Sequence, residues 1–106
     1  MVTSLVAFDV LGEPRRRQIL DLLREGERSV GDLVGCLDLS QPAVSKHLRV
    51  LKDAGLVDAR AEAQRRLYRI SPGPLQALDD WLEPYRTFWT THLDRLESHL
   101  EQRRKQ

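Results

Sequence analysis

Six side chains between residues 41 and 52 combine hydrogen-bonding groups with positive charge on one side of a predicted helix. In chain order they are Gln41, Ala43, Ser45, Lys46, Arg49 and Lys52. Amide, hydroxyl and methyl groups contact base edges in the major groove of DNA, whereas lysine and arginine bind phosphate oxygens. Gln41 suits an adenine edge, and Ala43 suits a thymine methyl group. The pattern predicts a helix that reads double-stranded DNA.

Ser40 and Gly55 mark the two ends of that helix. Ser40 is a good N-cap because its hydroxyl can accept backbone N–H groups of the first turn, where Pro42 is tolerated. Leu39 and Val44 have the spacing of a hydrophobic staple. The apolar stripe that faces the core consists of Val44, Leu48 and Leu51. Ser40 and Pro42, at the N-terminus of this helix, are included among the candidate DNA-binding residues.

A shorter helix precedes the DNA-reading helix. Ser29 and Asp32 have the spacing of a capping box, with an aspartate at the third position. The apolar face that follows consists of Val30, Leu33, Val34 and Leu37. Residues 37–39 leave room only for a tight turn, so residues 29–54 are predicted to form a helix-turn-helix.

After Gly55 the hydrophobic period changes from helical to alternating. Residues 56–60 and 66–70 are strand candidates joined by a polar link at 61–65, so we expect a β-hairpin. Three arginines near its tip would lie over the adjacent DNA backbone, namely Arg60, Arg65 and Arg66. A basic hairpin beside a helix-turn-helix is a wing. The predicted fold is therefore mainly α with a small β-hairpin, a winged helix-turn-helix.

The charges are concentrated in the middle of the chain. The 106 residues hold 17 basic and 16 acidic side chains, for a net charge of +1. Residues 40–70 hold seven basic and three acidic side chains, whereas residues 74–106 hold five basic and six acidic ones. A basic middle on a nearly neutral protein is typical of a nucleic-acid-binding face, although a solvated hairpin and helix also account for it.

The C-terminal residues form one long helical pattern. Its apolar residues recur at steps of three and four, as Leu75, Leu78, Leu82, Tyr85, Trp89, Leu93, Leu96 and Leu100. Pro84 lies inside the pattern and should kink or break the helix near Glu83. A stripe of this length cannot be buried against a small domain, so we expect self-association through a long C-terminal dimerisation helix. The candidate dimerisation residues are Leu78, Leu82, Tyr85, Trp89, Leu93 and Leu96.

Three segments of the chain resemble the ArsR/SmtB-type winged-helix transcriptional repressors. They are LGEPRRRQILDLL, SVGDLVGCLDLSQPAVSKHLRVLKDAGLV and RRLYRISP, and they span roughly Leu11 to Leu75. The resemblance implies a homodimeric regulator that binds an inverted-repeat operator in double-stranded DNA, with Gln41–Ala54 as recognition helix and Leu56–Ile70 as wing. The expected layout is one domain over residues 1–106, with dimerisation helices at 1–12 and 72–106, the helix-turn-helix at 29–54 and the wing at 55–70.

The metal ligands of this family are missing at the matching positions. Many members bind metal through a Cys-x-Cys pair in the third helix, where this chain has Ser29 and Gly31 and therefore no thiolate for a soft metal. Other members bind zinc between their terminal helices. Here His92 lacks an acid two residues earlier, and His99 is followed at the third position by Gln102. We expect no metal and no cofactor, with a metal-responsive repressor that uses His92 and His99 as the alternative.

Several other polar residues have expected roles. Cys36 is expected to be a small buried apolar residue. His47, inside the recognition helix, is expected to pack or to donate to the backbone rather than to titrate as a switch. Arg15, Arg16 and Arg17 open a helix where positive charge opposes the macrodipole. That misfit suggests a phosphate contact or an ion pair for at least one of them, and three solvated side chains with their aliphatic stems on the core are an equal alternative.

Other classes of protein are disfavoured. One cysteine allows no intrachain disulfide, and the chain shows no signal peptide and no apolar stretch of about 20 residues, so we expect a cytoplasmic protein without membrane contact. The absence of a phosphate-binding loop and of a nucleophile elbow predicts that it is not an enzyme. A winged-helix domain that binds an acidic protein partner is the second hypothesis, and salt-dependent binding to genomic DNA separates the two. The sequence identifies no small-molecule effector.

Overall fold

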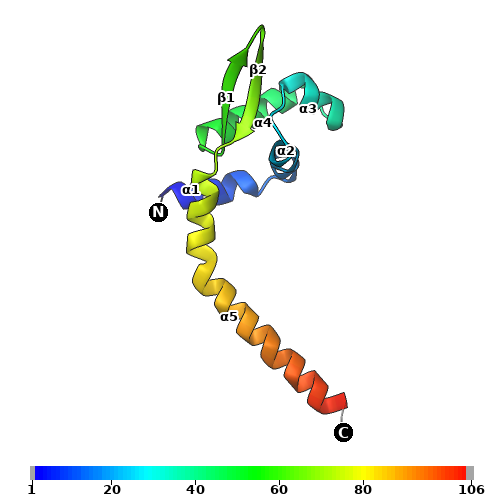
Figure 1. Cartoon of the computed structure of the whole chain (residues 1–106), viewed down its shortest axis with the longest axis vertical. Coiled ribbons are helices and arrows are strands. Elements are labelled where there is room, and N and C mark those ends of the chain that lie inside the picture. Colours follow the sequence, from blue (N-terminus) through cyan, green and yellow to red (C-terminus); the bar gives the residue numbers. More distant parts are fainter. Residues whose placement is uncertain (1, 105–106) are drawn as a thin grey trace.

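The computed structural model describes residues 2–104, with side chains from Val6 onward. The described chain contains five helices and one two-stranded sheet (Figure 1). In order they are α1 (Val2–Leu11), α2 (Pro14–Arg24), α3 (Val30–Cys36), α4 (Gln41–Asp53), β1 (Val57–Glu62), β2 (Arg65–Ile70) and α5 (Gly73–Arg104). The expected fold class, mainly helical with a small hairpin and a long C-terminal helix, is confirmed. The expected terminal ranges also include Met1, Lys105 and Gln106, which lie outside the described residues.

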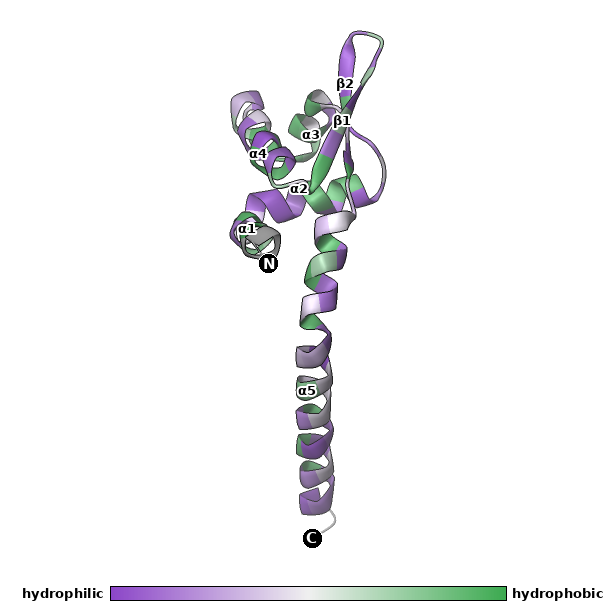
Figure 2. Ribbon diagram, turned by 90° about the vertical axis from the view of Figure 1, so that its left-hand side faces the viewer, coloured by the Kyte–Doolittle hydropathy of each residue, from purple (hydrophilic) through white to green (hydrophobic). Residues whose placement is uncertain are grey.

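The core lies between the end of α1, the helices α2, α3 and α4, and the start of the hairpin. Its buried residues are Val10, Ile19, Leu20, Leu23, Leu33, Val44, Leu48, Leu51, Leu56 and Val57. The predicted apolar stripe of α4 is fully inside, because its spacing of four and three residues puts one side chain per turn on the same face. Figure 2 shows the body of the molecule at one end and α5 extending away from it.

Local hydrogen bonds fix the ends of α3 and α4 as the sequence predicts. Ser29 and Asp32 form a reciprocal capping box, with N–O distances of 3.0 and 3.1 Å. The Ser40 hydroxyl accepts from the Ala43 N–H at 3.3 Å. Gly55 ends α4 with a φ of +77°, and Leu56 N–H donates to the Leu51 carbonyl at 2.9 Å, which is a Schellman motif. These caps set the direction in which α4 leaves the turn and the hairpin begins.

The hairpin is longer and its turn is tighter than the sequence suggests. Val57 pairs with Ile70 at the base, and Glu62 pairs with Arg65 at the tip, so only Ala63 and Gln64 form the turn. Ala63 has a φ of +56°, a left-handed conformation that an alanine rarely adopts. The sequence has no Asn-Gly or Asp-Gly pair here, so the expected link at residues 61–65 was too long.

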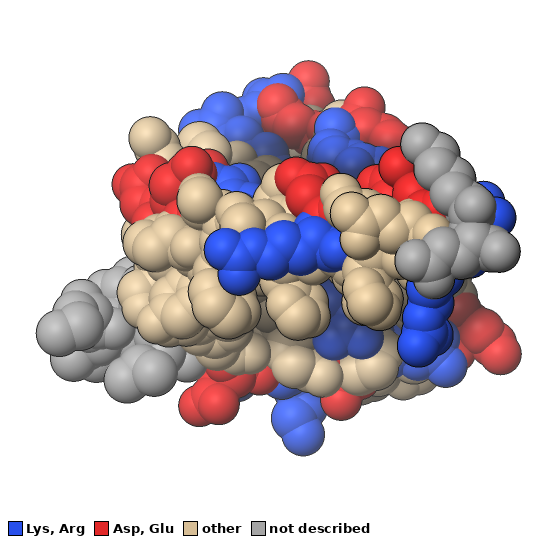
Figure 3. Space-filling view, turned by 90° about the horizontal axis from the view of Figure 1, so that it is seen from below, with Lys and Arg blue, Asp and Glu red and all other residues tan. Residues whose placement is uncertain are grey.

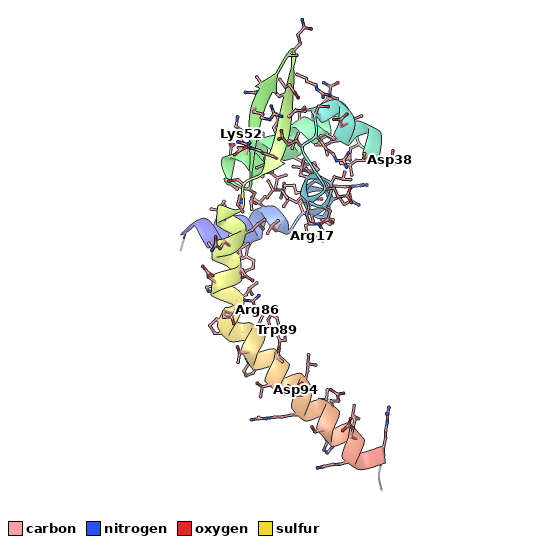
Figure 4. The ribbon with its side chains drawn as sticks, in the orientation of Figure 1. Arg17, Asp38, Lys52, Arg86, Trp89 and Asp94 are labelled. Carbon is pink, nitrogen blue, oxygen red and sulfur yellow. The ribbon has the colours of Figure 1, made fainter. Side chains whose placement is uncertain are left out.

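Pro84 does not break α5, contrary to one of the two expected outcomes. The helix is continuous over Gly73–Arg104, and it changes direction beside Arg86 (Figure 4). Bending is the expected effect of a proline that removes one backbone hydrogen bond and crowds the preceding turn. Most of α5 extends from the body, giving the molecule overall dimensions of 68 × 31 × 20 Å.

The α1–α2 corner is held by arginine side chains at carbonyl groups. Arg16 Nε donates to the Val10 carbonyl at 2.6 Å, and an Arg17 guanidinium nitrogen donates to the Leu11 carbonyl at 2.8 Å. The expected ion pair with an aspartate or glutamate is therefore not formed by Arg15, Arg16 or Arg17 among the described residues, and the expected phosphate contact stays a prediction. The last carbonyls of a helix lack intrahelical donors and carry partial negative charge, so cations are favourable there.

Candidate nucleic-acid interface

The exposed face of α4 carries the residues predicted to read DNA. Gln41, Ser45, Lys46 and Arg49 are exposed, as are Ser40 and Pro42 at the start of the helix, whereas Ala43 is half-buried. The buried stripe on the opposite side holds this face outward. The structure therefore brings the hydrogen-bonding and basic side chains of α4 onto one accessible surface.

A polar groove joins α4 to the hairpin. Its volume is about 340 Å3, and Ser45, Arg49 and Lys52 line it on the side of α4. Arg66 and Tyr68 line it on the side of β2, and Leu48 and Asp53 complete the wall. Figure 4 shows Lys52 on α4 next to the base of the hairpin. Ser45 and Arg49 of the predicted recognition helix and Arg66 of the predicted wing, which were predicted separately from the sequence, thus line one groove.

The three predicted wing arginines have different surroundings. Arg60 Nε is 2.7 Å from a Glu27 carboxylate oxygen, and its guanidinium lies 3.9 Å from Glu62. Arg65 and Arg66 are exposed, and neither forms an ion pair with any of the described residues. Arg60 therefore anchors the hairpin to the body, and the free positive charge of the wing lies at Arg65 and Arg66.

A second anchor of the hairpin was missed by sequence reasoning. Arg28 and Tyr68 form an isolated antiparallel bridge, with backbone N–O distances of 2.8 and 3.1 Å. The Arg28 side chain also donates to the Leu22 carbonyl and pairs with Glu25, both at 3.3 Å. This bridge connects the segment before α3 to β2. No local sequence pattern signals such a contact, because 40 residues separate the two partners.

His47 lies on the side of α4 that faces the start of α2. Its Nδ1 is buried and has no hydrogen-bond partner in the described part of the chain. Burial lowers the pKa of His47 below its usual value, and the nearby Arg16 guanidinium lowers this pKa further. His47 is thus packed half-buried in the fold, and a backbone hydrogen bond, the other expected outcome, is not formed through Nδ1.

Cys36 is exposed at the end of α3, so the expected burial is wrong. The buried side of α3 is centred on Leu33, and Cys36 falls off that side in the last turn. Ser29, which matches one cysteine position of metal-binding members, is used as the N-cap of α3. Among the side chains from Val6 to Arg104, no three His, Cys, Asp or Glu residues come together.

The predicted dimerisation residues divide into two groups. Leu78 is only 6% exposed and belongs to the protomer's own interior, which corrects its assignment as a free dimer contact. Leu82 is half-buried, and the exposed members are Tyr85, Trp89, Leu93 and Leu96. The contact of α1 with the first turns of α5 was not predicted from the sequence, because it joins opposite ends of the chain.

Aromatic residues missed by sequence reasoning extend this surface. Phe8 on α1 packs edge-on against Trp81, with ring centroids 5.3 Å apart, and Trp81 lies 4.7 Å from Tyr85. Phe88, one turn further, is 72% exposed. Seen from the C-terminal end of α5, uncharged atoms occupy much of the middle of the molecule, with charged groups of both signs around them (Figure 3). Five of the six aromatic side chains of the chain lie on α1 and α5. This concentration in two segments of the sequence could have indicated that the two helices share an aromatic surface.

No helix within residues 2–104 combines the length and the apolar character needed to cross a membrane.

Comparison with known proteins agrees with this architecture. Residues 13–59 match the family described as "Bacterial regulatory protein, arsR family". The chain is 42% identical over 87 residues to the HTH-type transcriptional regulator Rv2034 of Mycobacterium tuberculosis, covering 82% of this chain and 78% of the relative. It is 33% identical over 75 residues to the transcriptional repressor SdpR of Bacillus subtilis, covering 71% and 83% of the two chains.

A solved structure gives the same picture for the fold. The homodimeric winged helix-turn-helix DNA-binding domain of Mb0332 from Mycobacterium bovis superposes with a TM-score of 0.66 and 32% identity, covering 79% of each chain. Over the matched 79% of the chain, the fold is therefore that of a winged helix-turn-helix DNA-binding domain. The chain belongs to the arsR family of bacterial regulatory proteins.

Proposed function

We propose that this arsR-family protein is a homodimeric, sequence-specific transcriptional repressor that binds an inverted-repeat operator in double-stranded DNA. One observation carries the proposal. Arg49 and Lys52 of α4 and Arg66 of β2 line one exposed groove and form no ion pairs among the described residues, whereas Arg16, Arg17, Arg28, Arg60 and Arg69 are bound to carbonyl or carboxylate groups. Positive charge without internal partners is available for phosphate groups.

The residues of this surface fall into two groups, those that contact base edges and those that bind phosphates. Gln41, Ala43 and Ser45 occupy the N-terminal half of α4, which enters the major groove in helix-turn-helix proteins and contacts base edges. The cations, which bind phosphates on either side, are Lys46, Arg49, Arg65 and Arg66. Ser40 and Pro42 set the approach of the helix N-terminus to the duplex. Arg60, which is engaged with Glu27, stiffens the wing.

Two copies are required because one α4 helix reads only a few base pairs. A two-fold axis relates two recognition helices to two half-sites one helical turn apart, about 34 Å along the duplex. The exposed apolar residues of α1 and α5 supply the dimer contact, since aromatic and leucine side chains are typical of buried interface centres. In this proposal residues 1–106 act as one domain in the cytoplasm, without enzymatic activity and without a metal or cofactor.

Selection of binding sites from a genomic fragment pool with the purified protein tests the function. The expected result is an inverted repeat bound by a dimer, with an affinity that falls steeply as salt is raised. A reporter gene placed behind the selected site should be repressed. Binding to an acidic protein partner without preference for any duplex would contradict the proposal, and activation of the reporter would contradict the assignment as repressor.

A further inference from the structure

The three arginines that open α2 have different surroundings. Arg16 and Arg17 each donate to a carbonyl in the last turn of α1, at 2.6 and 2.8 Å. The guanidinium of Arg15 instead donates to the Gln18 side chain at 3.3 Å, at an exposed position. It forms no ion pair among the described residues. Since a guanidinium carries five N–H donors, most of those of Arg15 are available for another partner.

The position of Arg15 at the start of a helix is electrostatically unfavourable by itself. Its charge opposes the partial positive charge of the helix N-terminus. Glu13, the N-cap of α2, accepts the backbone N–H of Arg15 at 3.1 Å but forms no ion pair with the guanidinium. The carbonyls of α1 offset this cost for Arg16 and Arg17. An anion bound from outside the chain would offset it for Arg15.

The start of α2 lies beside the helix that we propose reads DNA. α2 and α4 are in contact, and His47 of α4 faces the start of α2. Burial is the largest cause that lowers the pKa of His47, and the charges of Lys46 and Arg15 lower this pKa further. The two cations, one on each helix, are therefore within electrostatic range of the same imidazole. Lys46 is exposed and, like Arg15, forms no ion pair among the described residues.

The wing and the start of α2 lie on different sides of α4. Ser45 and Arg49 face the hairpin in the polar groove, whereas His47 faces α2. At about 100° per residue, Ser45 and His47 lie about 160° apart around the helix, on either side of the buried stripe. Lys46 falls on the exposed arc between Arg49 and the α2 side. Figure 2 shows the hydrophilic start of α2 next to α4 and away from the hairpin.

We propose, on the basis of the DNA binding proposed above, that Arg15 and Lys46 form a second phosphate contact on the side of α4 away from the wing. The partner is a phosphodiester group of the duplex, which supplies the negative charge that neither cation finds among the described residues. Gln18 orients the guanidinium of Arg15 toward it. The DNA backbone is thus held on both sides of the recognition helix, by Arg66 on one side and by Arg15 on the other.

The position of this contact on the operator follows from the corner between α1 and α2. The start of α2 adjoins the end of α1, and the two helices pack against each other. In the proposed homodimer the exposed apolar residues of α1 and α5 meet at the two-fold axis, so the α1 side of α4 lies toward the axis and the wing lies away from it. The Arg15 contact therefore falls on phosphates between the two half-sites, and the Arg66 contact falls on phosphates at the outer ends.

The consequence is that the centre of the operator is bound without its bases being read. Phosphate contacts fix the register of a protein on the duplex but carry no sequence information directly. With one Arg15 on each side of the two-fold axis, the distance between the half-sites becomes part of recognition. The base pairs between the half-sites contribute only through the shape and stiffness of the DNA.

Salt titration of Arg15→Gln tests the contact, on the selected inverted repeat and on a scrambled duplex of the same length. Affinity should fall roughly tenfold on both duplexes, and the slope of log affinity against log salt should flatten by about 0.9 for each half-site. Arg15→Lys, which keeps the charge, should retain the slope. The matched control is Arg24→Gln, nine residues later and therefore on the opposite side of the same helix, which should leave affinity and slope unchanged.

Methylphosphonate linkages, which remove the charge of single phosphates, locate the contact on the operator. A neutral linkage between the half-sites should weaken binding of the wild-type chain, whereas Arg15→Gln should lose nothing more from the same change. A neutral linkage at the outer ends should weaken both proteins alike. If a central linkage matters equally to both proteins, or if the coupling to Arg15 appears only at the outer ends, the placement of the contact is overturned.

The same experiments separate this inference from the proposed function. If Gln41→Ala and Arg66→Ala weaken binding while Arg15→Gln behaves as Arg24→Gln does, Arg15 is a solvated side chain and only this inference is overturned. If the wild-type chain binds neither duplex, the proposed function is overturned together with the contact.

Discussion

Arg16 donates from Nε to the carbonyl of Val10 at 2.6 Å and thereby fixes the end of α1 to the start of α2. The same Arg16 lies close enough to His47 of α4 for its charge to lower the pKa of that imidazole. Arg16 thus holds α1 by a hydrogen bond and, through its charge, acts on α4, the helix that we propose reads the bases. This connection makes the corner a point where stability and DNA binding can be tested together.

Replacing Arg16 with methionine should weaken the corner. The variant keeps an apolar stem but leaves the Val10 carbonyl without its charged donor, so we expect the free energy of unfolding to fall by about 1–2 kcal/mol. Arg15→Met is the matched control, because Arg15 contacts only Gln18 through its side chain, at an exposed site. Urea unfolding of both variants measures the difference. An equal loss of unfolding free energy in the two variants would show that the hydrogen bond to the Val10 carbonyl does not stabilise the fold.

Acidification should destabilise the fold through His47. Its pKa is lower in the folded chain than the usual 6.5, so the unfolded chain binds more protons between the folded value and 6.5. Stability is therefore complete above that window, falls as the pH drops through it and levels off below the folded pKa. His47→Gln should flatten this part of the stability–pH curve. An unchanged curve in His47→Gln would contradict the assignment.

Removing two seam side chains should weaken the dimer. Trp89→Ala together with Leu93→Ala deletes two exposed apolar anchors. At about 2 kcal/mol each, the dimer dissociation constant should rise on the order of 1000-fold, or the protein should aggregate, and operator binding should be lost. Sedimentation over a concentration series measures the change, with Thr91→Ala on the opposite side of the helix as control. A tightly DNA-binding monomer would refute the role of these residues.

DNA affinity should not depend on metal. Ser29 is committed to the cap of α3 and Gly31 has no donor atom, so the third helix offers no metal ligand at the positions used by related proteins. Operator affinity should stay the same within twofold after treatment with a chelator, zinc or arsenite. A large change that disappears in His92→Ala or His99→Ala would instead indicate a metal site on the terminal helices.

Features encoded by neighbouring residues could be predicted from the sequence. The caps at Ser29 and Ser40, the stripe of α4 and the stop at Gly55 each depend on residues within one or two turns, so spacing was sufficient. The ion pair between Arg60 and Glu27 could not be predicted, because 33 residues separate its partners. The turn at Ala63 could not be predicted either. Its left-handed backbone conformation is set by the pairing of the strands around it and not by the conformational preference of alanine.

In the candidate site, too, features that depend on neighbouring residues were predictable, whereas contacts between distant residues were not. The exposed residues of α4 were predictable because burial of one side of a helix determines which residues remain on the other. Residues of α4 share one groove with Arg66 and Tyr68 because the hairpin folds back beside α4. Only the structure gives that arrangement. Likewise, the aromatic contact of Phe8 with Trp81 joins elements from opposite ends of the chain.

A salt titration of binding to operator and scrambled duplexes tests the central claim most directly. Each phosphate contact should add about 0.9 to the slope of log affinity against log salt. Arg66→Ala should weaken binding to both duplexes and flatten the slope by about that amount per half-site. Gln41→Ala should keep the slope but lose about 1–3 kcal/mol at one base pair of each half-site. If Arg66→Ala abolishes sequence preference while Gln41→Ala changes only the slope, the assignment of α4 to bases and of the wing to phosphates is contradicted.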